Sequence, residues 1–142
     1  MPIRKAQATW EGGLRGGKGS FRGESGAING GYSFGSRFEQ SGGSNPEELL
    51  AAAEAACFSM ALGAGLEKHG TPATKVETDA ACTIEKVGDG FKITSMRLIT
   101  RATVSNLDDA TFQQIAAATK EGCPVSQALK GNMEIVLEAT LV

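Results

Sequence analysis

The sequence predicts an α+β fold in which antiparallel sheets pack around a buried central helix. Extended segments on both sides of the longest apolar run alternate apolar and polar side chains with the period of two that is typical of half-buried strands. The segment over residues 46–68 is small and apolar on nearly every face, which is typical of a helix surrounded by other structure. At 142 residues the chain has the size of one domain, and we assign residues 1–142 to it.

The N-terminal part predicts a β-hairpin followed by irregular backbone. Residues 6–11 alternate apolar and polar side chains, and residues 18–21 resume the extended pattern after a glycine-rich turn. Most of the glycines lie in this part of the chain, where they favour tight turns over helix. The pair Gly30-Gly31 therefore predicts another turn, and residues 36–45 are expected to form a loop.

The helix expected over residues 46–68 has clear signals at both ends. Asn45 is a suitable N-cap, Pro46 fits the first helical position, and the two glutamates that follow lie where the helix dipole favours acidic side chains. A glycine and a proline shortly after Lys68 end the helix.

Two strands follow this helix. Residues 75–84 and 91–104 alternate on either side of a Gly-Asp-Gly turn, which predicts an antiparallel hairpin. The alternation of the second strand is imperfect near Ser95, and this irregularity indicates a β-bulge.

The last part of the chain predicts two helices and a strand. Asp108 or Asp109 caps a helix that reaches about residue 120, and Cys123 begins a short helix that ends near residue 129. Residues 133–141 alternate strictly and predict a strand with one buried face.

Charge and cysteine content favour a cytoplasmic protein without a nucleic-acid or membrane partner. The formal net charge of −2 lacks the basic excess that DNA or an anionic membrane attracts. The first residues contain no apolar core of an export signal, and the run over 49–66, interrupted by Glu54, is judged too weakly hydrophobic to span a membrane. The three cysteines therefore do not predict a framework of structural disulfides.

Neither a metal site nor a bound cofactor is expected. Cys57, Cys82, Cys123 and the single His69 show no short spacing of the kind that metal ligands have. The glycine-rich segment lacks the strand, loop and helix order of a phosphate-binding loop.

The thiols are the remaining candidates for chemistry. Cys123 is expected at the N-cap of a short helix, where backbone N–H groups and the helix dipole stabilise a thiolate. Cys57 lies in the middle of the apolar helix, where burial raises a thiol pKa unless a cation approaches. Cys82, on the apolar face of a strand, is interpreted as a core residue.

Several segments together resemble one protein family. They are Asn-Pro-Glu-Glu-Leu-Leu at 45–50, Ala-Ala-Cys-Phe-Ser-Met-Ala-Leu at 55–62 and Gly-Cys-Pro-Val-Ser at 122–126. Their order and separation resemble the OsmC/Ohr family of bacterial peroxide-reducing proteins, and the details are more similar to the osmotically inducible (OsmC) branch than to the organic hydroperoxide resistance (Ohr) branch. The similarity extends over essentially the whole chain.

This resemblance implies an OsmC-like fold in an intertwined homodimer, and an antioxidant stress-response enzyme. Cys57 would be the peroxidatic cysteine and Cys123 the resolving cysteine of a peroxidase that reduces organic hydroperoxides, and hydrogen peroxide less well. The sulfenic acid formed on Cys57 would condense with Cys123, and a dithiol of the lipoyl type would reduce the disulfide.

The resemblance also implies a cation and a carboxylate at the site. Arg37 is the matching arginine, with Arg22 and Lys18 as other basic candidates, and Glu47 is the matching glutamate. Glu47 and Cys57 are ten residues apart, about 15 Å along one helix. We therefore expect Glu47 to reach the active site of the other subunit.

Two other functions stay open at this point. The Cys-Pro-Val-Ser segment at residues 123–126 is similar to the redox-active turn of thiol–disulfide oxidoreductases, which would be centred on Cys123 and would not need Cys57. The third possibility is a non-enzymatic, stress-protective protein that binds small apolar ligands and keeps its cysteines in the core.

Overall fold

The structure is a computed structural model that describes residues 1–142. The chain forms two compact units, Met1–Leu49 and Leu50–Val142. The helices and strands confirm the predicted α+β class. The assignment of residues 1–142 to a single domain stays a prediction.

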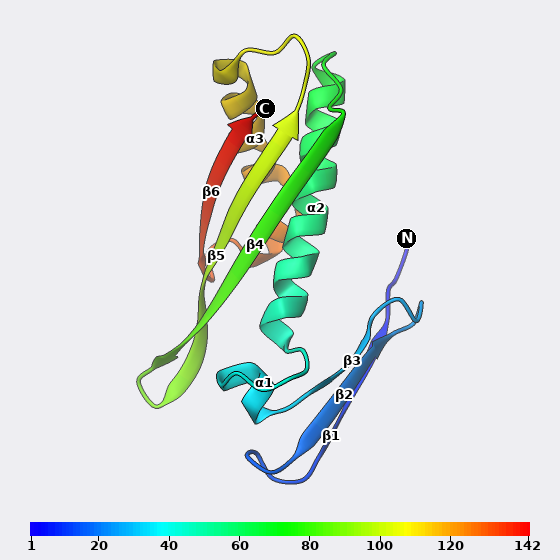
Figure 1. Cartoon of the computed structure of the whole chain (residues 1–142), viewed down its shortest axis with the longest axis vertical. Helices are drawn as coiled ribbons and strands as arrows, with labels where there is room; N and C mark the ends of the chain where they lie inside the picture. Colours follow the sequence, from blue (N-terminus) through cyan, green and yellow to red (C-terminus); the bar gives the residue numbers. More distant parts are fainter. The chain divides into compact units, whose positions relative to one another are not determined.

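A three-stranded antiparallel sheet forms most of the first unit (Figure 1). Its strands are β1 (Ala6–Glu11), β2 (Lys18–Gly23) and β3 (Asn29–Tyr32), in that order. β1 and β2 form the predicted hairpin. The turn expected around Gly30 is wrong, because Gly30 lies inside β3, where a Cβ atom would come within 2.9 Å of the Phe21 ring. The absence of a side chain at Gly30 allows the Phe21 ring to lie close to the backbone of β3.

A short helix, α1 (Phe34–Phe38), stands where the sequence predicts the start of a loop. Ser33 is its N-cap: the Ser33 hydroxyl oxygen accepts a hydrogen bond from the backbone N–H of Ser36 at 3.1 Å. In return, the Ser33 N–H donates to Ser36 Oγ at 2.8 Å. This is a capping box with serine in the place usually taken by Glu or Gln, and its sequence signal is therefore weak.

The long helix α2 (Pro46–Lys68) has the predicted bounds. Asn45 caps it, because Asn45 Oδ1 accepts a hydrogen bond from the backbone N–H of Glu48 at 2.8 Å. Soon after its end, Gly70 adopts the left-handed φ of 92° that favours glycine.

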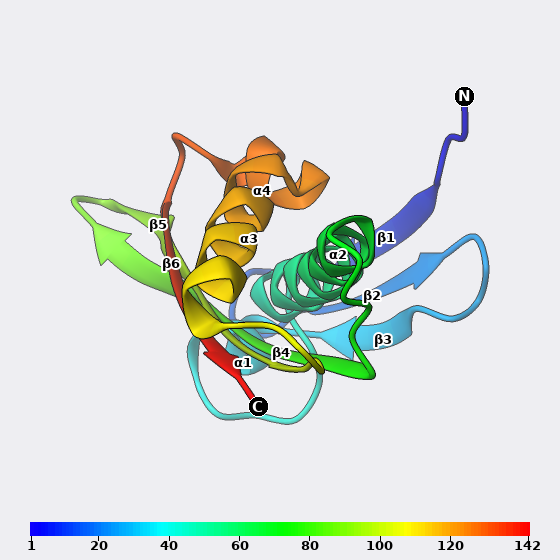
Figure 2. The same ribbon diagram turned by 90° about the horizontal axis from the view of Figure 1, so that it is seen from above.

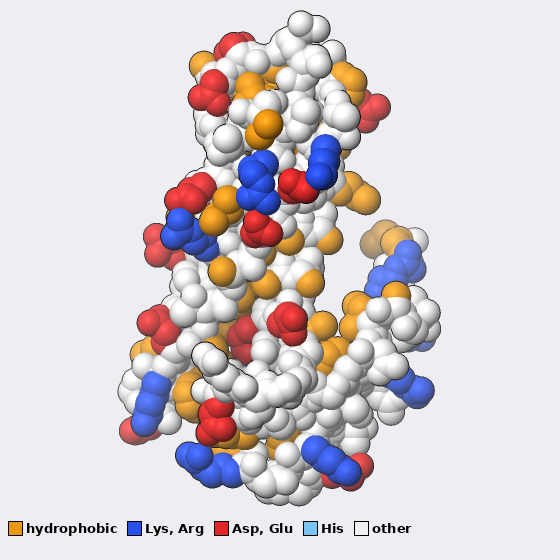
Figure 3. Space-filling model, viewed as in Figure 1, with side chains coloured by type: hydrophobic (Ala, Val, Ile, Leu, Met, Phe, Trp, Pro, Cys, Tyr) orange, Lys and Arg blue, Asp and Glu red, His pale blue; other side chains and the backbone are white.

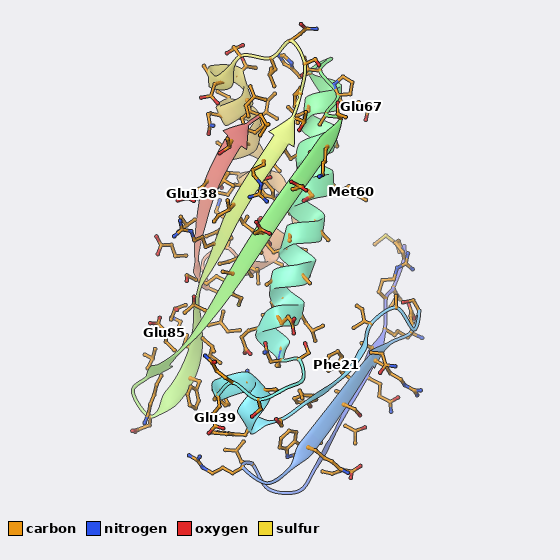
Figure 4. The ribbon with its side chains drawn as sticks, in the orientation of Figure 1. Phe21, Glu39, Met60, Glu67, Glu85 and Glu138 are labelled. Carbon is orange, nitrogen blue, oxygen red and sulfur yellow. The ribbon has the colours of Figure 1, made fainter.

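Only one face of α2 is covered within the second unit. Its buried side chains follow a four-residue spacing: Glu54, Phe58, Leu62 and Leu66. Met60 projects from another face and is 80% exposed (Figure 4). That α2 is a central helix covered on all sides therefore stays a prediction.

The length and composition of this helix contradict the expectation that the segment is too weakly hydrophobic to span a membrane. α2 is long and apolar enough to cross a bilayer by those two measures alone. Core helices of soluble proteins meet the same measures, and one face of α2 packs into the core of its unit.

The second unit contains a sheet of three strands in the order β4, β5, β6 (Figure 1). β4 (Lys75–Val87) and β5 (Gly90–Thr103) form the predicted antiparallel hairpin. The register shifts so that Thr94 has no paired residue, and the bulge predicted near Ser95 is confirmed.

The third strand corrects the prediction of antiparallel sheets. β6 (Glu134–Leu141) pairs with β5 in parallel. The connection between them runs through α3 (Asp109–Gly122) and α4 (Pro124–Leu129), and a crossover of this length returns the chain to the end of the sheet where β5 begins. Alternation along residues 133–141 predicts the strand and its buried face, but it contains no information about direction.

Helices α2 and α3 lie beside each other against one face of this sheet (Figure 2). The buried core between the layers consists of Phe58, Leu62, Leu66, Met96, Leu98, Ala102, Val104, Phe112, Ala116 and Cys123. The opposite face of the sheet carries charged side chains of both signs (Figure 3), which form exposed ion pairs such as Arg97–Glu138 at 2.7 Å and Arg101–Asp79 at 3.0 Å.

Candidate functional site

Two of the predicted site residues, Cys57 of α2 and Cys123 at the start of α4, meet in the second unit. Their Sγ atoms are 3.0 Å apart, and the Cys123 thiol donates toward the Cys57 sulfur. Both are free thiols; Cys123 is 1% exposed, whereas Cys57 is half-buried. A disulfide bond is about 2.05 Å long, so the two sulfurs are about 1 Å from bonding distance. A small movement would join them.

The path of the chain around Cys123 explains this close approach. The backbone N–H of Cys123 donates to the Thr119 carbonyl at 2.8 Å and closes α3. Its carbonyl accepts from the N–H of Gln127 at 2.9 Å and opens α4, with Pro124 in the first turn. Cys123 is therefore the N-cap that the sequence predicts, although its side chain makes no capping hydrogen bond.

A backbone N–H group in the first turn of α4 donates a hydrogen bond to the sulfur of Cys57. The N–H of Val125 donates a hydrogen bond to Cys57 and lowers the pKa of that thiol. The N-cap position of Cys123 predicts this stabilisation for Cys123 itself. The structure directs it to Cys57, which sequence reasoning could not place beside α4.

The remaining groups around Cys57 raise the pKa of its thiol. Burial is the main cause that raises the pKa of the Cys57 thiol, and the adjacent Cys123 and the Glu54 carboxylate raise it further. The balance in the single chain favours the protonated thiol. A cation at the Cys57 sulfur would favour the thiolate. That a basic residue activates Cys57 stays a prediction.

The other two predicted site residues, Arg37 of α1 and Glu47 of α2, form an ion pair in the first unit. Arg37 Nη2 and Nε lie 2.8 Å and 3.1 Å from Glu47 Oε1. The Glu47 side chain is 6% exposed and the Arg37 side chain is 36% exposed. The Arg37 guanidinium carbon also lies 5.2 Å from the centre of the Phe38 ring. Arg37 is thus held in place while part of its guanidinium can still bind an anion.

Each of these two pairs is assembled within its own unit. The ion pair belongs to Met1–Leu49, and the two sulfurs belong to Leu50–Val142. Their meeting in one active site stays a prediction.

The alternative basic candidates have different surroundings. Arg22 donates to Gln7 Oε1 at 2.9 Å on an exposed face of the first sheet, and Lys18 lies opposite Glu11 in the β1–β2 register. Among the three basic candidates, Arg37 has the buried carboxylate partner. Arg37 is therefore the most strongly oriented of them.

A buried polar contact near the sulfurs is absent from the sequence-based site. The hydroxyl of Ser126 donates to Oε1 of Glu54, and both side chains are essentially inaccessible to solvent. The signal in the sequence is a glutamate within an otherwise apolar helix, where hydropathy alone indicates only an interruption of a hydrophobic run.

The third cysteine is in a different environment. Cys82 of β4 is half-buried and packs against the core of the second unit, which agrees with its interpretation as a core residue. No group of three His, Cys, Asp or Glu side chains is arranged to hold a metal ion.

Comparison with known proteins gives consistent matches in sequence. The family model described as OsmC-like protein matches residues 39–138. Peroxiredoxin OsmC of Escherichia coli is 46% identical over 133 residues, which cover 93% of each chain. Organic hydroperoxide resistance protein OhrB of Bacillus subtilis is 34% identical over 97 residues, which cover 68% of this chain and 69% of OhrB.

Solved structures share the fold. The crystal structure of Bacillus subtilis OhrB matches with a TM-score of 0.71 at 26% identity, and the match covers 95% of this chain and 97% of that chain. An OsmC-like protein from Mycoplasma pneumoniae matches with a TM-score of 0.76 over 99% of this chain and 98% of that chain, at 14% identity. The latter likeness concerns the fold alone.

Proposed function

Because the chain belongs to the OsmC-like protein family, we propose that it is a thiol-dependent peroxidase that reduces organic hydroperoxides to alcohols, and hydrogen peroxide less well. The observation that carries this proposal is the 3.0 Å separation of the Cys57 and Cys123 sulfurs. The names of its relatives, a peroxiredoxin and an organic hydroperoxide resistance protein, agree with it.

The proposed cycle uses the two thiols and no cofactor. The Cys57 thiolate attacks one oxygen of the O–O bond and becomes a sulfenic acid, while the other oxygen leaves as an alkoxide and takes up a proton to give the alcohol. The Cys123 thiol then attacks the sulfenic sulfur, which forms the disulfide and releases water. A dithiol of the lipoyl type reduces the disulfide and is itself oxidised. We place this cycle in the cytoplasm, where glutathione and thioredoxin keep ordinary thiols reduced.

Arg37 and Glu47 support the first step of this cycle. The Arg37 guanidinium stabilises the Cys57 thiolate and orients the peroxide oxygens, and Glu47 holds the guanidinium through the contact at 2.8 Å. This role is consistent with the raised pKa of Cys57 in the single chain, which calls for a cation.

The proposed assembly is an intertwined homodimer with two active sites. Its support is the apolar helix α2, of which one face is covered within its unit while Met60 is 80% exposed. Glu47 and Cys57 are about 15 Å apart along the helix axis, so Glu47 and its partner Arg37 serve Cys57 of the other subunit.

The function is tested first on the wild-type chain. We expect catalytic consumption of cumene hydroperoxide with dihydrolipoamide as the reductant, and slower consumption of hydrogen peroxide. Without the dithiol, one equivalent of hydroperoxide should produce the Cys57–Cys123 disulfide, which peptide mass spectrometry detects. Cys82→Ser is the matched control, because Cys82 packs against the core from β4 and takes no part in the 3.0 Å contact between Cys57 and Cys123, and it should keep full turnover. A wild-type chain that consumes no hydroperoxide would contradict the proposal.

The dimer makes a separate prediction about Met60. A charge at this exposed apolar position should prevent burial of α2 against a second subunit, so Met60→Glu is expected to be a monomer with little turnover. Light scattering should give the mass of one 14.7 kDa chain for this variant and twice that mass for wild type and for the control Met60→Leu. A monomeric Met60→Glu with full activity would rule out the role of Glu47 across subunits.

A further inference from the structure

Glu54 and Ser126 form a buried polar contact that the proposed cycle does not use. The Glu54 side chain is 0% exposed and Ser126 is 1% exposed, and the Ser126 hydroxyl donates to Glu54 Oε1. The second oxygen, Oε2, is buried without a hydrogen-bond partner. Such an oxygen is unfavourable in an apolar interior, and an apolar side chain would avoid that cost. Packing alone therefore does not explain a glutamate here.

The position of this contact relative to the sulfurs suggests its role. Glu54 precedes Cys57 by three residues on α2, and Ser126 follows Cys123 by three residues at the start of α4. Residues three apart in a helix lie on the same face. The Glu54–Ser126 hydrogen bond and the Cys57–Cys123 contact therefore connect the same two helices, about one turn apart.

We propose that Glu54 is a positioning residue for the disulfide step: its buried contact with Ser126 holds α4 against α2, so that Cys123 meets Cys57. The contact acts on the second step of the cycle, in which the Cys123 thiol must reach the oxidised Cys57. The biological meaning of this inference depends on the proposed peroxidase function. The positioning itself can be measured with any two-electron thiol oxidant.

The charge of Glu54 gives a second, independent readout. Its carboxylate raises the pKa of Cys57. Other charged groups on this side are Lys120, Glu121 and Lys130, which line a cavity of about 150 Å³ next to Ser126, and Lys130 is paired with Glu121. Glu54→Gln removes the charge but keeps an oxygen for Ser126. We therefore expect the pH midpoint of Cys57 alkylation to move to lower pH in Glu54→Gln.

The experiment measures intramolecular disulfide formation with diamide, which takes up the two electrons and two protons of the thiols and becomes a hydrazine. The informative quantity is the limiting rate of disulfide formation at high diamide concentration, because that rate measures the intramolecular step between the two cysteines. Ser126→Ala and Glu54→Ala should slow it by roughly tenfold to a hundredfold, because a misplacement of about 1 Å has effects of that size. Glu54→Gln should stay near the wild-type rate, as should the control Glu67→Gln at an exposed position of α2.

Each result bears on the proposal. If Ser126→Ala and Glu54→Ala form the disulfide at the wild-type rate, the positioning role is wrong, even if the alkylation midpoint of Glu54→Gln has moved. Thermal unfolding identifies a variant that fails to fold, and Ser126→Ala, which removes one oxygen atom, keeps the test decisive if Glu54→Ala does not fold. A wild-type chain that consumes no hydroperoxide but shows these diamide rates would remove the peroxidase proposal and leave the role of Glu54 intact.

Discussion

Replacement of Cys57 by serine is expected to abolish hydroperoxide turnover. A serine hydroxyl has a far higher pKa than a thiol and does not form a sulfenic acid, so the reacting sulfur is lost. Since enzymes accelerate reactions by about 10⁶-fold or more, we expect the rate to fall by at least roughly a thousandfold. The measurement is consumption of cumene hydroperoxide with saturating dithiol, with unfolding curves to show that Cys57→Ser is folded.

Cys123→Ser provides the matched comparison. It should still reduce one equivalent of hydroperoxide, but the sulfenic acid on Cys57 should persist and react with dimedone, because its partner at 3.0 Å is missing. If instead Cys57→Ser keeps turnover and Cys123→Ser loses it, Cys123 is the nucleophile. In that case a thiol–disulfide oxidoreductase would replace the peroxidase as the proposed function.

Replacement of Arg37 by methionine should produce the second largest effect. Hydrogen bonds to charged groups contribute about 1.5–3 kcal/mol, which corresponds to roughly 10- to 100-fold in kcat/KM at neutral pH. The direction of the pH effect follows from Cys57, whose pKa burial raises in the single chain. Without the guanidinium the thiolate forms only at higher pH, so the midpoint of the pH–rate profile should rise. Stopped-flow kinetics from pH 5 to 9 measure both effects.

Two further variants show whether Arg37 is the activating residue. Arg37→Lys keeps the charge but loses the planar fork that contacts Glu47, so it should recover only part of the rate. Arg22→Met, at an arginine that bonds to Gln7 on an exposed face, should behave like wild type. A large loss in Arg22→Met with a normal Arg37→Met would assign the activation to Arg22 instead.

Elements with local signals are predictable from this sequence. The bounds of α2 follow from Asn45 and Pro46 at one end and from Gly70 just beyond the other, and each acts within a few residues. The sequence does not predict β3, because Gly30 lies against the Phe21 ring of the neighbouring strand and does not form a turn. This contact depends on the pairing of two strands, and the local sequence pattern does not contain it.

In the candidate site, too, local features can be predicted from the sequence, whereas contacts between distant residues cannot. Local reasoning identifies Cys123 as an N-cap, but the thiol that receives the backbone N–H bond is Cys57, 66 residues away in sequence. The family resemblance provides the roles of the two cysteines, which spacing alone does not. Glu54 and Ser126 are 72 residues apart, and their contact is visible only in the folded chain.

The parallel pairing of β6 with β5 has a consequence for the order of folding. The β4–β5 hairpin joins neighbouring segments and can form early, whereas β6 can dock only after α3 and α4 have crossed the sheet. Cys123 lies within that crossover, so its thiol can reach Cys57 only once the crossover packs against the sheet. On the ribosome, a nascent chain therefore carries Cys57 without its partner until the crossover that contains Cys123 has been synthesised. During that interval, the thiol that the finished protein would use against peroxides is itself exposed to them.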